Sequence, residues 1–183
     1  TIDPLQESIR QVELVSDISM ILDACGRATG MGFVAVARVT EDRWVTCASR
    51  DTINFGLTPG DELDVASTIC REVRACRSII TIPDVDESDV YRNHPTPLQY
   101  GFKSYISVPI VRSDDSIWGT LCALDPDPRD IGPQEEQLFT IFARSIAREL
   151  DRQDELAMGR QEIAEGRANL QTERDTARLR EEF

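Results

Sequence analysis

The 183 residues carry a formal net charge of −13 at pH 7, which disfavours nucleic acids and anionic membrane surfaces as partners, because both repel an acidic protein at long range. Hydrophobic residues make up 40% of the chain, enough for the core of one domain of ordinary size plus an extension. The five cysteines lack CxxC spacing and are odd in number, which argues against a disulfide framework and favours a reduced, cytoplasmic protein.

Nothing in the sequence predicts a membrane segment. No apolar run approaches the roughly 20 residues that span a bilayer, and the amino terminus has no signal-peptide pattern. We therefore expect a soluble, cytoplasmic protein without membrane contact. Because the chain begins without Met and stops inside a helical pattern, we also expect it to belong to a longer protein.

The first element is an amphipathic helix. From Pro4 to about Cys25, apolar residues recur every three or four positions, and Pro4 suits the first turn while Gly26 suits the end. The β-rich runs 33–39 and 43–49 then predict a hairpin. The sheet is therefore expected to be mainly antiparallel.

The middle of the chain predicts a loop, a helix and a short strand. Gly and Pro mark residues 52–61 as a loop, after which Asp61 or Asp64 could cap a helix that ends near Cys76. Its apolar side would consist of Leu63, Ala66, Ile69, Cys70 and Val73. Residues 79–82 predict a short strand.

A second hairpin is predicted from the runs 103–111 and 116–124, which flank a polar turn. One face is apolar and should pack on helices, with small residues that would let a helix approach closely: Ile106, Val108, Ile110, Gly119, Leu121 and Ala123. The other face mixes rings, hydroxyls and a thiol: Tyr105, Ser107, Pro109, Trp118, Thr120, Cys122 and Leu124. Such a mixture suits a ligand cavity, and a second core layer with its hydroxyls bonded to backbone is the alternative.

The carboxyl-terminal part predicts one uninterrupted helix from Pro133 to Phe183. Its first apolar stripe should cover the helix-packing face of the sheet: Leu138, Ile141, Phe142, Ile146 and Leu150. Beyond Asp151 the composition is strongly charged, and one apolar lane recurs every seven residues: Leu156, Ile163, Leu170 and Ala177. A single charged helix cannot bury this lane, so we expect a weak coiled-coil homodimer of parallel helices, with a solvated monomeric helix as the alternative.

Several of these segments carry a family resemblance. The runs FKSYISVPI and SIWGTLCALDPDPR, followed by a helix that opens at Pro133, resemble the end of a GAF domain, a small-molecule and light-sensing module related to PAS domains. The resemblance covers most of residues 4–150. It implies an α+β fold: a mainly antiparallel GAF/PAS-like sheet with helices packed on one face and a ligand-type pocket on the other, plus a long C-terminal coiled-coil helix. We divide the chain into a sensory domain, 1–150, and a signalling helix, 151–183, that leads to an output domain outside this sequence.

The last residues, ARLREEF, resemble the linker before the phosphoacceptor helix of bacterial sensor histidine kinases. This resemblance implies a two-component histidine kinase as the full-length protein, with a diguanylate cyclase as the main competitor. The segment from Asn93 to Asp125 also looks like the bilin-holding segment of phytochromes, with His94 near their chromophore-contacting histidine. No cysteine lies between Cys76 and Cys122, so covalent bilin attachment is not expected and the cofactor stays unknown.

An enzymatic function has little support in the sequence. With His94 as the single histidine, no metal site and no catalytic residue can be assigned, and no phosphate-binding glycine motif occurs. GAF relatives that reduce free methionine sulfoxide use clustered cysteines, and Cys47 and Cys122 could both face the cavity. Buried packing cysteines are the favoured interpretation.

We predict a small-molecule site between the mixed hairpin face and the irregular segment 83–100, because loops on a rigid scaffold commonly hold ligands. Its residues would be Tyr91, His94, Tyr100, Tyr105, Ser107, Thr120 and Cys122. The predicted function is that of a sensory domain that passes the state of its pocket through the coiled coil. A ligand-independent dimerisation or spacer module and a photosensor with a non-covalent bilin are the alternatives.

Overall fold

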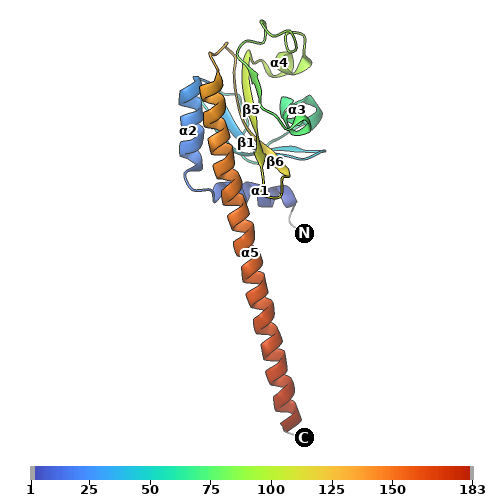
Figure 1. The fold of residues 1–183 in the computed structure, drawn as a ribbon. Helices are drawn as coiled ribbons and strands as arrows, with labels where there is room; N and C mark the ends of the chain where they lie inside the picture. The colour runs from blue at the N-terminus through green and yellow to red at the C-terminus, as the bar shows by residue number, and fades with distance from the viewer. Residues whose placement is uncertain (1–2, 182–183) are drawn as a thin grey trace. The chain divides into compact units, whose positions relative to one another are not determined.

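Residues 3–181, which the computed structural model describes, form one six-stranded sheet in the order β3-β2-β1-β6-β5-β4 (Figure 1). Every neighbouring pair is antiparallel, as predicted from the two hairpins. The strands are β1 (Phe33–Val39), β2 (Trp44–Asp51), β3 (Glu62–Leu63), β4 (Ile80–Ile82), β5 (Ser104–Val111) and β6 (Ile117–Asp125).

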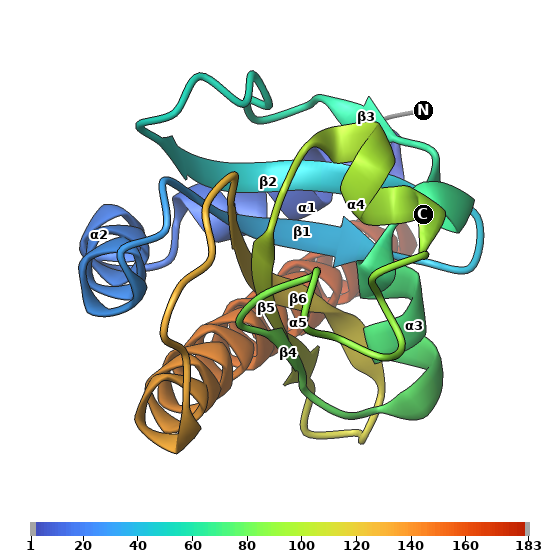
Figure 2. The same ribbon diagram turned by 90° about the horizontal axis from the view of Figure 1, so that it is seen from above.

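Helices cover both faces of this sheet. They are α1 (Pro4–Glu13), α2 (Ile18–Thr29), the 3-10 turn η1 (Val65–Ser67), α3 (Ile69–Cys76), α4 (Pro95–Tyr100) and α5 (Pro133–Glu181). Figure 2 shows α1, α2 and the first part of α5 on one side of the sheet and α3 and α4 on the other. The buried side chains accordingly form two clusters, one on each side. The α+β class is confirmed.

The core on the side of the sheet that carries α1, α2 and α5, called the helix-side core from here on, is sealed by α5. The residues of this helix that are fully buried there are Phe139, Ala143, Ile146, Ala147 and Leu150. The predicted stripe was right at Ile146 and Leu150, and its members Leu138 and Phe142 are partly buried. It was wrong at Ile141, whose side chain is 52% exposed. Apolar residues on two adjacent faces of this helix satisfy the same spacing, and only the packing on the sheet selects between them.

The single amino-terminal helix that we predicted is two helices. The chain breaks before α2, where Asp17 adopts a left-handed conformation with φ 61°. The predicted stop at Gly26 is also wrong, because α2 continues to Thr29 and ends at Gly30 with φ 71°. Gly26 instead gives room to a side chain: a Cβ there would lie 2.4 Å from Nη1 of Arg50.

The predicted helix from Asp61 or Asp64 begins later than expected, at Ile69. The two residues of β3 pair with β2, which keeps the chain extended up to Leu63. Asp64 does cap a turn, but it is the turn η1, where its carboxylate accepts the Ala66 N–H at 3.1 Å. Local capping chemistry therefore acted as predicted, whereas strand pairing set where the α-helix starts.

Gly119 serves strand pairing rather than the helix approach that we predicted. A Cβ at this position would lie 2.0 Å from the carbonyl oxygen of Ala37 in the neighbouring strand β1. The other members of the predicted apolar hairpin face do pack in the helix-side core. Trp118, predicted on the mixed face, also joins that core, and the Arg38 guanidinium lies 5.3 Å from the centre of its ring.

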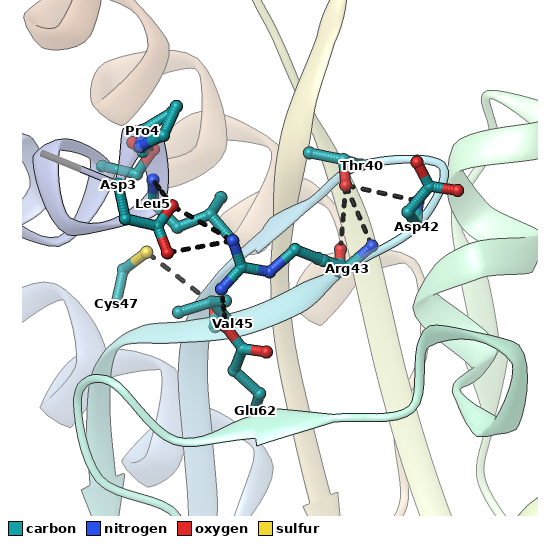
Figure 3. Close-up of polar contacts among 10 residues, drawn as sticks. Asp3, Pro4, Leu5, Thr40, Asp42, Arg43, Val45, Cys47 and Glu62 are labelled. Atoms are coloured by element: carbon teal, nitrogen blue, oxygen red, sulfur yellow. Dashed lines mark hydrogen bonds and ion pairs between the residues drawn. The ribbon is translucent and has the colours of Figure 1, made fainter. Parts of the chain in front are cut away.

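An arginine fixes the amino-terminal helix to the sheet (Figure 3). Nη1 of Arg43 lies 3.0 Å from the carboxylate of Asp3, and its other terminal nitrogen contacts Glu62. Asp3 also accepts the Leu5 N–H at 3.0 Å and so caps α1. This backbone bond and the Arg43 guanidinium hold the pKa of Asp3 below its usual value. The arginine thus joins α1, β2 and β3.

By its internal contacts, the chain divides into residues 1–150 and 151–183. In the second unit, the described residues up to Glu181 are helical and mostly exposed, including Leu156, Ile163, Leu170 and Ala177. The predicted end of this helix at Phe183 lies outside the described residues. Within residues 3–181, no helix is both long enough and apolar enough to cross a bilayer.

A buried carboxylate joins the end of β6 to the start of β1. Asp125 accepts the Gly32 N–H at 2.8 Å and the Asp127 N–H at 2.9 Å, and Nη2 of Arg129 lies 3.1 Å from it. These three partners come from the beginning of β1 and from the segment that leads into α5. Asp125 therefore fixes the path by which the chain leaves the sheet.

We predict that Asp125→Ala lowers the free energy of unfolding by about 3 kcal/mol, because it leaves two N–H groups and a partly buried guanidinium without their shared acceptor. Asp127→Ala is the matched control. Its carboxylate is 75% exposed and lies 4.0 Å from Arg129, so the loss should stay within about 0.5 kcal/mol. Chemical denaturation measures both, and equal losses would contradict the role assigned to Asp125.

Candidate functional site

An apolar cavity lies on the sheet face opposite to α5. Its enclosed volume is about 40 Å³, and at its mouth it continues into a wider groove. Strands β1, β2, β5 and β6 form one wall, and α3, α4 and the loop 52–61 form the other. Six aromatic side chains contribute to the lining: Phe33, Trp44, Phe55, Tyr100, Phe102 and Tyr105. A site of this kind suits a small, mostly apolar molecule.

Two rings stand at the mouth of the cavity, where it opens into a wider groove of about 510 Å³. Phe55 and Tyr100 line both spaces, and their ring centres lie 6.4 Å apart. The loop that carries Phe55 is held by the carboxylate of Asp51, which accepts the N–H groups of residues 53, 55 and 56. The Tyr100 hydroxyl contacts that of Ser67. Both rings are thus positioned by polar contacts outside the cavity.

A thiol cluster, defined as Cys70, Tyr105, Ser107, Thr120 and Cys122, lies at the floor of the cavity, and Cys70, Tyr105 and Cys122 line it. The Thr120 hydroxyl donates to Sγ of Cys70 at 3.2 Å, the Tyr105 hydroxyl lies 3.2 Å from the same sulfur, and that of Ser107 lies at 3.9 Å. Hydrogen bonds from Cys122, Thr120 and Tyr105 hold the pKa of Cys70 below its usual value despite its burial. The Cys70 sulfur in turn raises the pKa of Cys122.

The predicted site residues separate into three groups. The first group lines the cavity, and the second lies directly behind its lining. Tyr100, Tyr105 and Cys122 line it. Ser107 and Thr120 do not line it, because they lie behind the lining and turn their hydroxyls toward Cys70. The mixed face of the hairpin therefore supplies rings to the cavity and hydroxyls to a buried sulfur.

Tyr91 and His94 are not brought into the cavity lining. Both contact the carboxylate of Glu72 in α3: the Tyr91 hydroxyl donates at 2.9 Å, and Nε2 of His94 lies at 2.9 Å. Nδ1 of His94 accepts the Thr96 N–H at 3.2 Å and caps α4. Burial and the Glu72 carboxylate raise the pKa of Tyr91. These two residues fasten the segment before α4 to α3, and His94, on which the phytochrome resemblance rests, lies outside the lining.

Sequence reasoning missed Cys70 and Trp44 as site residues. Cys70 was on the predicted apolar side of α3, but the pattern did not say which sheet face that helix covers. Cys47, which we placed at the cavity, belongs to the helix-side core, so it and Cys122 lie on opposite faces. Burial raises the pKa of Cys47 to about 12. Within the described residues, no group of His, Cys, Asp and Glu side chains is placed to hold a metal ion.

The GAF domain family model matches residues 14–150 of this chain. A comparison with curated proteins found no match. The solved structures with the same fold include the blue-light absorbing form of the PixJ GAF domain from Thermosynechococcus elongatus, at 19% identity. That match covers 90% of this chain and 96% of the PixJ domain, with a TM-score of 0.65.

Two further solved structures illustrate the range of proteins with this fold. The GAF domain of a phosphoenolpyruvate-protein phosphotransferase from Acinetobacter is 12% identical, with a TM-score of 0.60 over 86% of this chain and 99% of that one. The bacteriophytochrome RpBphP3 from R. palustris is 18% identical, with a TM-score of 0.64 over 87% of this chain. This chain spans 39% of the length of that bacteriophytochrome and 61% of its chromophore-binding domain. At these identities the likeness concerns the fold alone.

We predict that Cys70 is the buried cysteine that iodoacetamide alkylates in the folded protein, with a rate that is half-maximal below the ordinary pKa of a thiol. The thiolate is the reactive form, and the pKa of Cys70 is lowered, whereas burial raises that of Cys25 and Cys47 to about 12. Thr120→Val removes one donor and should move the midpoint upward by about one pH unit. Peptide mass spectrometry between about pH 5 and pH 9 measures the rates. A midpoint at the ordinary thiol value would contradict the prediction.

Proposed function

The chain belongs to the GAF domain family, whose members are regulatory and sensory modules, and we propose that this one senses a small, largely apolar molecule in the cavity beneath α3 and α4. The cavity is lined almost entirely by carbon, and its few polar groups are grouped at the floor and the mouth. A ligand that is aromatic or aliphatic and carries little charge fits this lining, because an ion would lose its hydration without a partner. The proposed protein is cytoplasmic.

The observation that carries this proposal is that one layer of sheet separates the cavity from α5. Tyr105 and Cys122 of β5 and β6 face the cavity, while their chain neighbours Ile106 and Leu121 belong to the core that α5 seals. The two strands pair along eight positions, so a displacement of one face moves the other. A ligand that pushes on Tyr105 would therefore change the packing of α5.

We propose that the output continues through residues 151–183 as a parallel coiled coil that leads to a sensor histidine kinase. The helix α5 is 49 residues long, and its lane Leu156, Ile163, Leu170 and Ala177 is unburied within one chain. A second copy of the same helix would cover this lane. In such an arrangement, a small shift in the packing of α5 alters the register or crossing of the paired helices.

Native mass spectrometry of protein purified without unfolding first identifies any co-purified molecule. Ligand binding is then tested with indole. We expect the wild-type domain to bind indole in isothermal titration and Leu57→Trp to bind at least tenfold more weakly, because the larger ring occupies space at the cavity wall where Leu57 lies. The control is Val90→Trp, a residue that is largely exposed and lines none of the described cavities. If both variants bind indole like the wild type, the cavity is not the site.

The coiled coil is tested by sedimentation equilibrium of the full chain. We expect a dimer, and Ile163→Lys should raise its dissociation constant at least tenfold, because burying an apolar side chain of this size contributes about 1.5–3 kcal/mol. Met158→Lys is the matched control: this residue is 63% exposed and Ile163 is 59% exposed, but Met158 lies outside the lane. A wild-type chain that stays monomeric at high concentration would contradict the dimer.

A further inference from the structure

The two cysteines of the thiol cluster have surroundings unlike those of the other buried cysteines. Cys25 and Cys47 lie in the helix-side core, where burial raises the pKa of each to about 12. Cys70, by contrast, has two hydroxyl oxygens at 3.2 Å from its sulfur. It also lies in the first turn of α3, where the helix dipole favours a negative charge.

An unpaired indole N–H lies in the same cavity as the two thiols. Trp44 is 3% exposed and lines the same cavity, yet its Nε1–H finds no hydrogen-bond acceptor among the described residues. The Trp44 side chain is also one of the groups that lower the pKa of Cys70. A buried N–H without a partner is costly in a neutral site, and that cost falls when the sulfur beside it is ionised.

The second thiol of the cluster, Cys122, lies close to Cys70. The Ser107 hydroxyl lies 3.9 Å from the Cys70 sulfur, and Ser107 is paired with Cys122 across β5 and β6, so the two thiols are neighbours at the floor of the cavity. Both cysteines line the cavity, which opens to the groove at its mouth. A small neutral molecule can therefore reach a pair of adjacent thiols without unfolding of the domain.

We propose that Cys70 and Cys122 are a peroxide-reactive dithiol, in which a hydroperoxide oxidises Cys70 and Cys122 then closes a disulfide bond. The inference stands apart from the proposed small-molecule ligand, because it needs only access of hydrogen peroxide to the floor of the cavity. The product would tie α3 to β6, the strand whose opposite face packs in the core with α5.

The reaction takes two steps, and its atoms and electrons balance. The Cys70 thiolate attacks one oxygen of hydrogen peroxide, the O–O bond breaks, and hydroxide leaves and takes a proton from solvent, which gives a sulfenic acid and water. Cys122 then attacks the sulfenic sulfur, the S–O bond breaks, and the departing hydroxide takes the proton of the Cys122 thiol as water. Two thiols are oxidised to one disulfide while one peroxide is reduced to two waters.

Peptide mapping of the full chain after treatment with hydrogen peroxide tests the proposal. The expected result is a crosslink between the peptide with Cys70 and the peptide with Cys122, which a reductant removes. Oxidation confined to Cys76, which is exposed, would overturn the proposal, as would a sulfinic acid on Cys70 with Cys122 unmodified. The wild-type map decides between these outcomes without any variant.

Variants then assign the two roles. Cys122→Ser should keep Cys70 in the sulfenic form, trapped by dimedone, and Cys70→Ser should abolish both the crosslink and the dimedone adduct. Cys76→Ser is the matched control and should form the crosslink at the wild-type rate. Circular dichroism verifies that each variant is folded. A dimedone adduct on Cys122 in the Cys70→Ser variant would reverse the assignment and overturn the proposed order of steps.

Discussion

The pairing of β6 with β1 and β5 is the constraint on which the rest of this domain depends. Because successive side chains of a strand point to opposite faces, residues 121–124 of β6 alternate between the core sealed by α5 and the cavity. Leu121 and Ala123 pack in the helix-side core, whereas Cys122 and Leu124 point to the opposite face and line the cavity. Gly119 keeps the strand close to β1, where no Cβ fits. A change at the cavity therefore reaches α5 through a single strand.

The energetics of the helix-side core limit what such a signal can be. Phe139, Ile146 and Leu150 of α5 are fully buried, and each contributes about 1.5–3 kcal/mol by burial. A weakly bound small molecule cannot release a helix held by several such contacts. The packing of α5 can shift, however, since close-packed cores pass a small displacement on to their neighbours. Repacking of α5 is therefore favoured over its detachment from the sheet.

The sequence predicted those features that local chemistry controls. The strand run 33–39, the hairpin at 103–124 and the start of α5 at Pro133 follow from β-branched residues, turn residues and a proline that suits a first helical turn. What it could not supply were the choices made by packing. Ile141 and Phe139 satisfy the same helical spacing, and only contact with the sheet buries one and exposes the other.

The same limit applies to the candidate site. Residue type correctly suggested rings at the cavity in Tyr100 and Tyr105. It could not foresee that Glu72 would engage both Tyr91 and His94, or that α3 would place Cys70 where hydroxyls predicted for a ligand contact sulfur instead. These contacts join residues that are distant in the sequence, and a single sequence carries no signal of such pairs.

Amide hydrogen exchange of the full chain, with and without indole, tests most directly whether the sheet couples the cavity to α5. We expect indole to alter exchange in β5, in β6 and in residues 139–150 of α5, although no residue of α5 lines the cavity. A change confined to the loop 52–61 and to α4, with exchange in α5 unaltered, would contradict this coupling.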